Sequence, residues 1–198
     1  FVDMASDQVE YIKGCRTLGI RSGLCVHSWD NLTNKGLIRI VPDRVFVWND
    51  AQKREAITMH GAQPEQVIPT GAPVYDQWFA RRPSTTREEF CRKVGLSPGT
   101  PFLLYLCSSQ FIAPDEAVFI EKWVRAVRCA PDPRVRQLGI LIRPHPENAQ
   151  PWQRFDESDL TGTVLWPRGG ANPVDQASKN DYFDSMYHSA AAVGINTS

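Results

Sequence analysis

The clearest strand pattern in the sequence lies at residues 138–148, LGILIRPHPEN. Its apolar residues follow one another without alternation, which predicts a strand buried on both faces, as parallel strands are when helices cover the sheet. Pro144 and Pro146 would end this strand, because proline has no N–H to donate to a strand ladder. Arg143 and His145 are then expected at its carboxyl end, the edge at which open α/β sheets bind ligands. On the local pattern alone, a surface loop with an incidental arginine and histidine is an equal alternative.

Apolar runs and helical patterns alternate along most of the chain. The runs predict strands at 20–27, 44–48, 66–69, 102–107, 164–166 and 191–195, besides the strand that reaches Arg143. Helical spacing predicts helices at 6–18, 49–60, 86–95 and 115–128, and a last helix capped by Asn180 or Asp181. Strand, helix and strand recur in steps of about 30 residues, the size of a βαβ unit, and right-handed crossovers make such strands parallel. The pattern therefore predicts an α/β fold with parallel sheets flanked by helices.

Two of the predicted helices carry start signals. Asn49 with Gln52, and Thr86 with Glu89, have the spacing of a capping box, in which each side chain bonds the backbone N–H of the other residue. Gly61 follows the first of these helices, at the position where a left-handed residue commonly ends a helix.

The hydrophobic pattern changes between about residues 75 and 101, where the regular spacing of apolar residues is lost and turn-forming residues are frequent. We therefore predict a first domain at 1–75, a connector at 76–101 and a second domain at 102–198. The chain begins at Phe1 and stops directly after an apolar run. We interpret it as a fragment in which both domains are incomplete.

A second strand exit is rich in hydrogen-bonding groups. The predicted strand at 20–27 leads into the loop Ser28-Trp29-Asp30-Asn31-Leu32-Thr33-Asn34-Lys35-Gly36. Loops that present such groups from a rigid sheet are common binding positions. The alternative is an Asx-rich turn whose side chains cap their own backbone.

Composition narrows the classes of function. In 198 residues, Lys plus Arg and Asp plus Glu both number 22, which argues against binding to bulk nucleic acid or to a charged membrane surface. No run approaches the roughly 18 apolar residues of a membrane helix, and no signal peptide opens the chain. The five cysteines are widely spread without a CxxC pair, which indicates reduced thiols and no zinc site. No GxGxxG motif follows a strand, so an oxidoreductase is not expected.

The order of these motifs resembles a known family. A capped helix, an apolar strand ending in small polar residues, the RPHP strand end and a helix leading to VGINTS resemble the second Rossmann-like domain of GT-B glycosyltransferases and their relatives. These relatives are the CDP-glycerol glycerophosphotransferases, the capsule polysaccharide transferases and the non-hydrolysing UDP-N-acetylglucosamine 2-epimerases. Residues 47–76 resemble the last strand–helix–strand unit of their first domain. The resemblance covers roughly residues 43–198 and implies two Rossmann-like domains of GT-B type.

The resemblance also implies which residues bind the donor. In that superfamily a nucleotide-linked donor lies between the domains and binds mainly to the second. The positions that match its phosphate-binding residues are Ser108, Ser109, Arg143, His145, Asn196, Thr197 and Ser198. Thr197 and Ser198 would open a helix, whose N-terminal N–H groups and dipole favour pyrophosphate. His145 would assist departure of the leaving group. On the first domain, His27 or Asp30 would be the general base that activates an acceptor hydroxyl.

The function that follows is transfer of a sugar or polyol-phosphate group from a nucleotide-activated donor to a glycan or lipid-linked hydroxyl, in surface polysaccharide or glycan synthesis. GT-B relatives generally work without a metal or a further cofactor, and no DxD motif occurs here. The location expected is cytoplasmic, either free or peripheral at the inner membrane face. Two alternatives stay open: a UDP-sugar 2-epimerase, and a nucleotide- or glycan-binding module without turnover.

Overall fold

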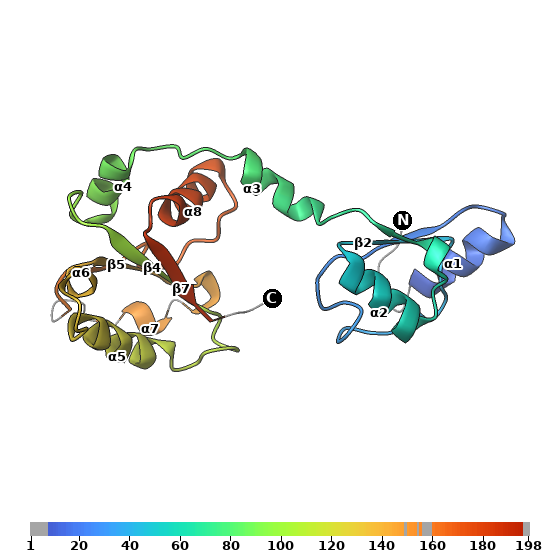
Figure 1. The fold of residues 1–198 in the computed structure, drawn as a ribbon, viewed down its shortest axis with the longest axis horizontal. Coiled ribbons are helices and arrows are strands. Elements are labelled where there is room, and N and C mark those ends of the chain that lie inside the picture. The colour runs from blue at the N-terminus through green and yellow to red at the C-terminus, as the bar shows by residue number, and fades with distance from the viewer. Residues whose placement is uncertain (1–7, 149, 154, 156–159, 196–198) are drawn as a thin grey trace. The chain divides into compact units, whose positions relative to one another are not determined.

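The computed structural model describes residues 8–148, 150–153, 155 and 160–195. The chain forms two compact units, Phe1–Arg81 and Arg82–Ser198 (Figure 1). Both are α/β units with a parallel sheet flanked by helices, which confirms the predicted fold class. The division between them falls within the predicted connector at 76–101. None of the described helices is long and apolar enough to cross a membrane.

The first unit is built on a three-stranded sheet in the order β1-β2-β3, with all pairs parallel. Its elements are α1 (Gln8–Thr17), β1 (Gly23–Cys25), β2 (Arg44–Val47), α2 (Asp50–His60), η1 (Pro64–Gln66), β3 (Val67–Pro69), η2 (Pro73–Tyr75) and α3 (Asp76–Ala80). Its core packs the buried apolar residues of all three strands against α2, among them Leu24, Val45, Ala56 and Val67.

Helix α2 begins and ends where the sequence predicts. The Asn49 side chain accepts a hydrogen bond from the Gln52 backbone N–H, and Gly61 ends the helix with a left-handed φ of 71°. The reciprocal half of the predicted capping box is wrong. The Gln52 carboxamide oxygen instead accepts from the backbone N–H of Trp48, 2.8 Å away, because its amide nitrogen is drawn to the carbonyls of Ser28 and Trp29.

The second unit is built on a four-stranded parallel sheet in the order β6-β5-β4-β7. Its elements are α4 (Arg87–Val94), β4 (Phe102–Leu106), α5 (Glu116–Arg128), α6 (Pro133–Arg136), β5 (Gly139–Arg143), η3 (Pro146–Asn148), α7 (Gln150–Gln153), β6 (Thr163–Leu165), α8 (Gln176–Tyr187) and β7 (Ala191–Gly194). Counted along the chain within this unit, the strand order is third, second, first, fourth. Such an order has a topological switch point beside its first strand, where α/β sheets form their ligand crevice.

Alternate residues of the central strands face opposite layers, as strand geometry requires. Ile140 and Ile142 of β5 pack against α5, whereas Leu141 packs against α4. Figure 1 shows α4 and α8 on one side of the sheet and α5 on the other. Arg143 follows Leu141 by two residues and therefore lies on the side of α4 and α8.

Helix α8 starts earlier than predicted. The prediction of Asn180 or Asp181 as its cap is wrong, because Asp175 accepts from the Ser178 backbone N–H and the helix begins at Gln176. Asn180 lies one turn inside the helix, where its side chain accepts from the Gln176 carboxamide.

Asp184 anchors α8 to the segment that enters the second unit. Its carboxylate is fully buried and accepts four hydrogen bonds of 2.7–3.0 Å, from the backbone N–H and the hydroxyl of both Ser84 and Thr85. His188 adds a bond from its ring to the Thr85 carbonyl, at 2.9 Å. These contacts hold α8 against the segment that precedes α4.

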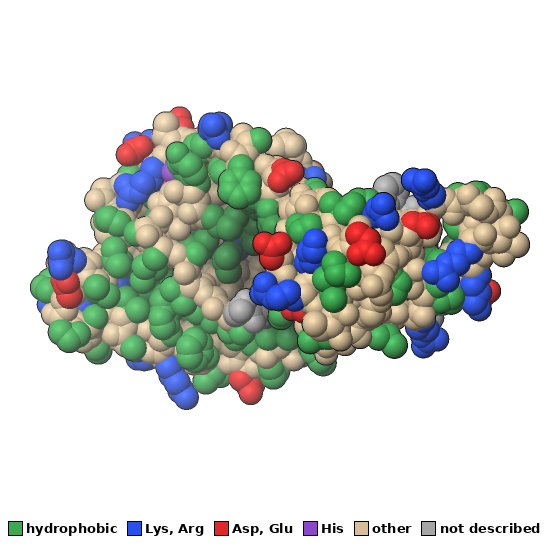
Figure 2. All heavy atoms as spheres, turned by 45° about the vertical axis from the view of Figure 1, so that its right-hand side comes forward, with side chains coloured by type: hydrophobic (Ala, Val, Ile, Leu, Met, Phe, Trp, Pro, Cys, Tyr) green, Lys and Arg blue, Asp and Glu red, His purple; other side chains and the backbone are tan. Residues whose placement is uncertain are grey.

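Charges of both signs are mixed on the surface. Among the described side chains on the face shown in Figure 2, Lys and Arg lie interspersed with Asp and Glu. This agrees with the balanced composition of the chain.

Candidate functional site

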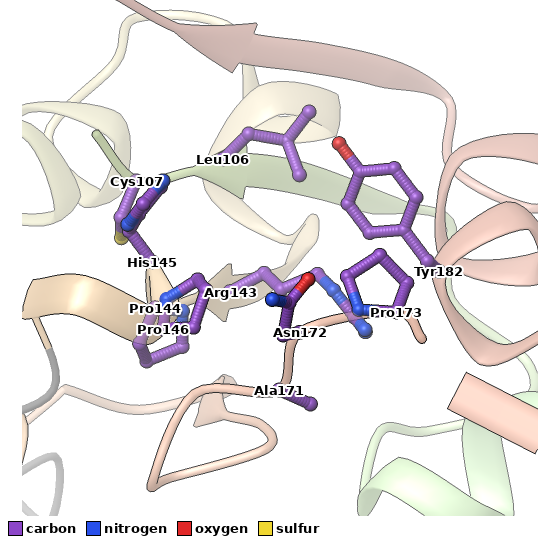
Figure 3. A pocket seen from close by; sticks show the side chains of 10 residues that line it. All are labelled: Leu106, Cys107, Arg143, Pro144, His145, Pro146, Ala171, Asn172, Pro173 and Tyr182. Atoms are coloured by element: carbon purple, nitrogen blue, oxygen red, sulfur yellow. The ribbon is translucent and has the colours of Figure 1, made fainter. Parts of the chain in front are cut away.

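A cavity of about 240 Å³ lies at the carboxyl edge of the second sheet (Figure 3). It is enclosed by the ends of β4 and β5, the loop after β6 and one residue of α8. The lining residues are Leu106, Cys107, Arg143, Pro144, His145, Pro146, Ala171, Asn172, Pro173 and Tyr182. Its volume is below the range of about 300–1,000 Å³ found for sites that enclose a whole drug-sized ligand. The cavity therefore suits one part of a larger ligand.

Arg143 supplies the charge of this cavity. Its side chain is 4% exposed, and its Nη1 is buried without a hydrogen-bond partner. The guanidinium carbon lies 5.4 Å from the ring centroid of Trp166 and 5.1 Å from that of Tyr182. Burial lowers the pKa of Arg143, and the nearby Tyr182 and Asp181 offset part of that effect. An arginine nevertheless stays protonated.

No described carboxylate forms an ion pair with Arg143. A buried cation without a counterion is costly, so the site gains free energy when an anion enters. Of the ten lining residues, Arg143 alone carries a permanent charge and none is acidic. The charge of the cavity therefore favours an anionic ligand over a cationic one.

His145 adds a directed donor. Its Nδ1 accepts a hydrogen bond from the backbone N–H of Glu147 at 3.1 Å. In a neutral imidazole the proton then lies on Nε2, which becomes a donor. Arg143 and His145 line the same cavity and carry guanidinium and imidazole N–H groups, a combination that suits phosphate oxygens.

Gly170 holds the loop after β6 against the end of β5. A Cβ at this position would lie 2.9 Å from Pro146 Cα and 3.1 Å from the His145 carbonyl oxygen, and the backbone has a φ of +67°. Only glycine combines this close approach with a left-handed conformation at low cost.

We expect Gly170→Ala to displace the loop that carries Ala171, Asn172 and Pro173, because backbone atoms of Pro146 block the added methyl group. The expected result is at least a tenfold loss of pyrophosphate affinity and a destabilisation of about 1–3 kcal/mol. Titration calorimetry and thermal unfolding measure the two effects. Gly169→Ala is the matched control, since a Cβ there meets nothing within 4 Å. Equal behaviour of the two variants would contradict the packing role of Gly170.

Ser108 and Ser109 do not line the cavity, whereas the two residues before them do. Ser108 is buried, donates its N–H to Glu116 at 2.8 Å, and accepts from the Asn148 amide at 3.4 Å. The Ser109 carbonyl accepts from the next turn of the chain. The backbone of both serines is thus engaged in shaping the β4 exit, and their contact with a donor stays a prediction.

Cys107 is the cavity's thiol. Burial raises its pKa well above the usual range, and the nearby Glu116 adds to the effect. A thiol in this state is a poor nucleophile, because the thiolate is the reactive form. Cys107 therefore shapes the wall and does not suit covalent chemistry.

The three predicted strand exits share one edge of the sheet. β4 lies between β5 and β7, all parallel, and Gly194 pairs in register with Leu106. The predicted site residues Asn196, Thr197 and Ser198 come after Ile195 in the sequence and lie outside the described residues, so their role stays a prediction.

In the first unit, the loop after β1 is an Asx-rich turn, as the alternative interpretation predicted. The Asn31 side chain accepts from the backbone N–H groups of His27 and Ser28, at 2.9 and 2.7 Å. The buried Asp30 carboxylate accepts from the Ser28 hydroxyl at 2.6 Å and pairs with Lys35 at 3.1 Å. The Ser28 hydroxyl, and then Lys35, lower the pKa of Asp30. His27 is exposed.

Trp166, Asn172 and Tyr182 were missed by the sequence interpretation. No local pattern marks them, since Trp166 follows an ordinary short strand and Tyr182 lies in the middle of helix α8. They reach Arg143 or its cavity only because β6 and α8 fold beside β5. In the described part of the chain, no three His, Cys, Asp or Glu residues gather as metal ligands.

Comparison with known proteins finds a distant structural likeness. No family model matches the sequence, and no curated protein matches it. The structure is similar to that of the wall teichoic acid polymerase TagF, with a TM-score of 0.42 and 12% sequence identity. The match covers 78% of this chain and 35% of TagF, so the chain spans about a third of that protein's length. A likeness at this level assigns no residue a role.

Proposed function

We propose that this protein transfers a sugar or polyol-phosphate group from a nucleotide-activated donor to a hydroxyl acceptor. The observation that carries the proposal is the buried Arg143 guanidinium, which lacks an ionic partner among the described residues and faces a cavity at the carboxyl edge of a parallel sheet. Such a cation selects an anionic ligand, and its place at the carboxyl edge of a parallel α/β sheet favours a nucleotide phosphate. The proposal includes membership of the GT-B superfamily, to which the RPHP strand end is similar.

The chemistry assigns separate tasks to the side chains. Transfer breaks the bond between the donor's phosphate and the transferred group and forms a bond to the acceptor oxygen. The departing nucleotide phosphate gains negative charge, which Arg143 and the Nε2–H of His145 would stabilise. The acceptor hydroxyl loses its proton to a base, for which His27 and Asp30 are the proposed candidates. Ser108, Ser109, Asn196, Thr197 and Ser198 are the further proposed donor contacts.

The acceptor proposed is a glycan or lipid-linked hydroxyl, in polysaccharide synthesis on the cytoplasmic side of a membrane. No further cofactor is assigned to the reaction. The turnover assay distinguishes this transferase from a UDP-sugar 2-epimerase and from a binding module without turnover.

Titration with UDP, CDP, GDP and pyrophosphate tests the donor site. At least one nucleotide diphosphate should bind, and backbone NMR should place the largest shift changes at Arg143 and His145. Adenosine, which carries no phosphate, is the control ligand. Binding without any change in this region would contradict the proposal.

Donor hydrolysis by His145→Ala and Asp30→Asn variants tests turnover. Loss of the Nε2–H donor should slow hydrolysis of the bound nucleotide donor by about a hundredfold, as loss of one charge-stabilising donor does in other enzymes. If nucleotides bind and the unaltered protein shows no hydrolysis or transfer, the module without turnover is the better description. If the protein interconverts UDP-sugars, it is better described as a UDP-sugar 2-epimerase.

A further inference from the structure

A carboxylate lies near Arg143 and does not pair with it. Asp181 precedes Tyr182 in α8 and forms an ion pair with Lys93 of α4. The Lys93 ammonium lies 5.6 Å from the ring centroid of Trp166, and the Arg143 guanidinium lies 5.4 Å from the same centroid. The Lys93 and Arg143 cations thus both lie near the Trp166 ring. The Asp181 carboxylate pairs with Lys93, which does not line the cavity.

We propose that Lys93 is a positioning residue that holds the Asp181 carboxylate away from Arg143 and so keeps the cavity positively charged for a phosphate ligand. This inference rests on the proposed function, because it concerns the same anion site. Lys93 does not line the cavity and would act only through Asp181.

The physical reason is competition for one buried cation. Arg143 has an unpartnered Nη1 in a site of low dielectric, where an ion pair is far stronger than in water. Asp181 already acts on Arg143 electrostatically, since it opposes the burial that lowers the pKa of that guanidinium. Without Lys93, the Asp181 side chain can turn toward Arg143, and an incoming phosphate then has to displace a carboxylate.

We expect removal of the Lys93–Asp181 pair to leave the unit folded. The Lys93 side chain is 46% exposed and that of Asp181 is 19% exposed. Because the Lys93 end of the pair is exposed to solvent, the pair contributes little to stability. A change in anion binding on their removal therefore reports on the cavity rather than on the fold.

The test measures pyrophosphate binding to the full 198-residue chain and to Lys93→Met, Asp181→Asn and double variants. Lys93→Met should weaken binding about tenfold, a usual size for coupling between two sites. Asp181→Asn should bind as tightly as the unaltered protein or more tightly. The double variant should return to within about twofold of the unaltered protein, because the competing carboxylate is gone. Arg125→Met, which removes an exposed pair on the same unit, is the charge control.

Two results would overturn the inference. If the double variant binds as weakly as Lys93→Met, Lys93 either touches the anion itself or supports the fold. If Lys93→Met binds pyrophosphate as tightly as the unaltered protein, Asp181 does not compete with the anion for Arg143. Circular dichroism melts of each variant confirm that it is folded.

A ligand-free measurement separates this inference from the proposed function. The guanidinium ¹H–¹⁵N signals of Arg143, assigned with an Arg143→Met variant, should show slowed rotation in Lys93→Met alone, because a carboxylate then holds the group. If the unaltered protein does not bind pyrophosphate, the proposed function fails while this signal still decides the role of Lys93. Absence of the slowed rotation in Lys93→Met overturns that role.

Discussion

Arg143→Met is expected to lower pyrophosphate affinity about a hundredfold and to leave the folded state at least as stable. The loss follows because truncating one partner of a desolvated charge pair costs about 2–5 kcal/mol. The stability is kept because the ligand-free protein loses a buried cation that has no ionic partner among the described residues, and methionine fills a similar volume. Titration calorimetry gives the affinity, and thermal unfolding gives the stability.

A matched control is Arg134→Met, in which the arginine is highly exposed and pairs with Asp132. It removes the same charge from the same unit and should change neither quantity by more than a factor of about two. If Arg143→Met binds pyrophosphate as before, the cavity does not recognise phosphate. If it loses binding together with stability, Arg143 serves the fold, and the proposed donor site has to be placed elsewhere.

Asp184→Ala is expected to destabilise the second unit by about 3 kcal/mol or more, the largest stability effect that the structure predicts. The four donors of Ser84 and Thr85 lose their charged acceptor, and hydrogen bonds to charged groups contribute about 1.5–3 kcal/mol each. Chemical denaturation measures the change. Glu121→Ala, which breaks an exposed ion pair, is the control and should cost less than about 1 kcal/mol.

The Asp184 carboxylate should also make the free energy of unfolding fall at acidic pH. Burial alone would raise the pKa of Asp184, but the hydrogen bonds from Thr85 and Ser84 and the nearby His188 lower it below its ordinary value. Its stabilisation is therefore fully present above the unfolded pKa of about 3.9 and is lost as the pH falls through the folded-state pKa. Asp184→Ala should flatten this part of the curve. If Asp184→Ala loses stability at acidic pH as the unaltered protein does, other carboxylates cause the pH dependence.

Much of the fold could be predicted because it depends on local chemistry. Unbroken apolar runs marked the strands, Asn49 and Gly61 marked the ends of α2, and the Thr86–Glu89 box marked the start of α4. These signals lie within a few residues of the structure that they determine. The cap of α8 was misplaced because several polar residues could serve, and packing of Asp184 against Ser84 and Thr85 decides where the helix lies.

The candidate site also has features that the sequence predicts and others that depend on the tertiary structure. The two prolines end β5 wherever it folds, so the sequence by itself determined that Arg143 and His145 leave the carboxyl end of a buried strand. It could not show that the Arg143 guanidinium lies beside the rings of Trp166 and Tyr182, or that Asp181 is bound by Lys93. Those contacts join residues from α4, β5, the end of β6 and α8, and only the tertiary structure decided them. The physical reason is that strand order and helix packing select neighbours across long separations, whereas a local pattern specifies only which face or end a residue occupies.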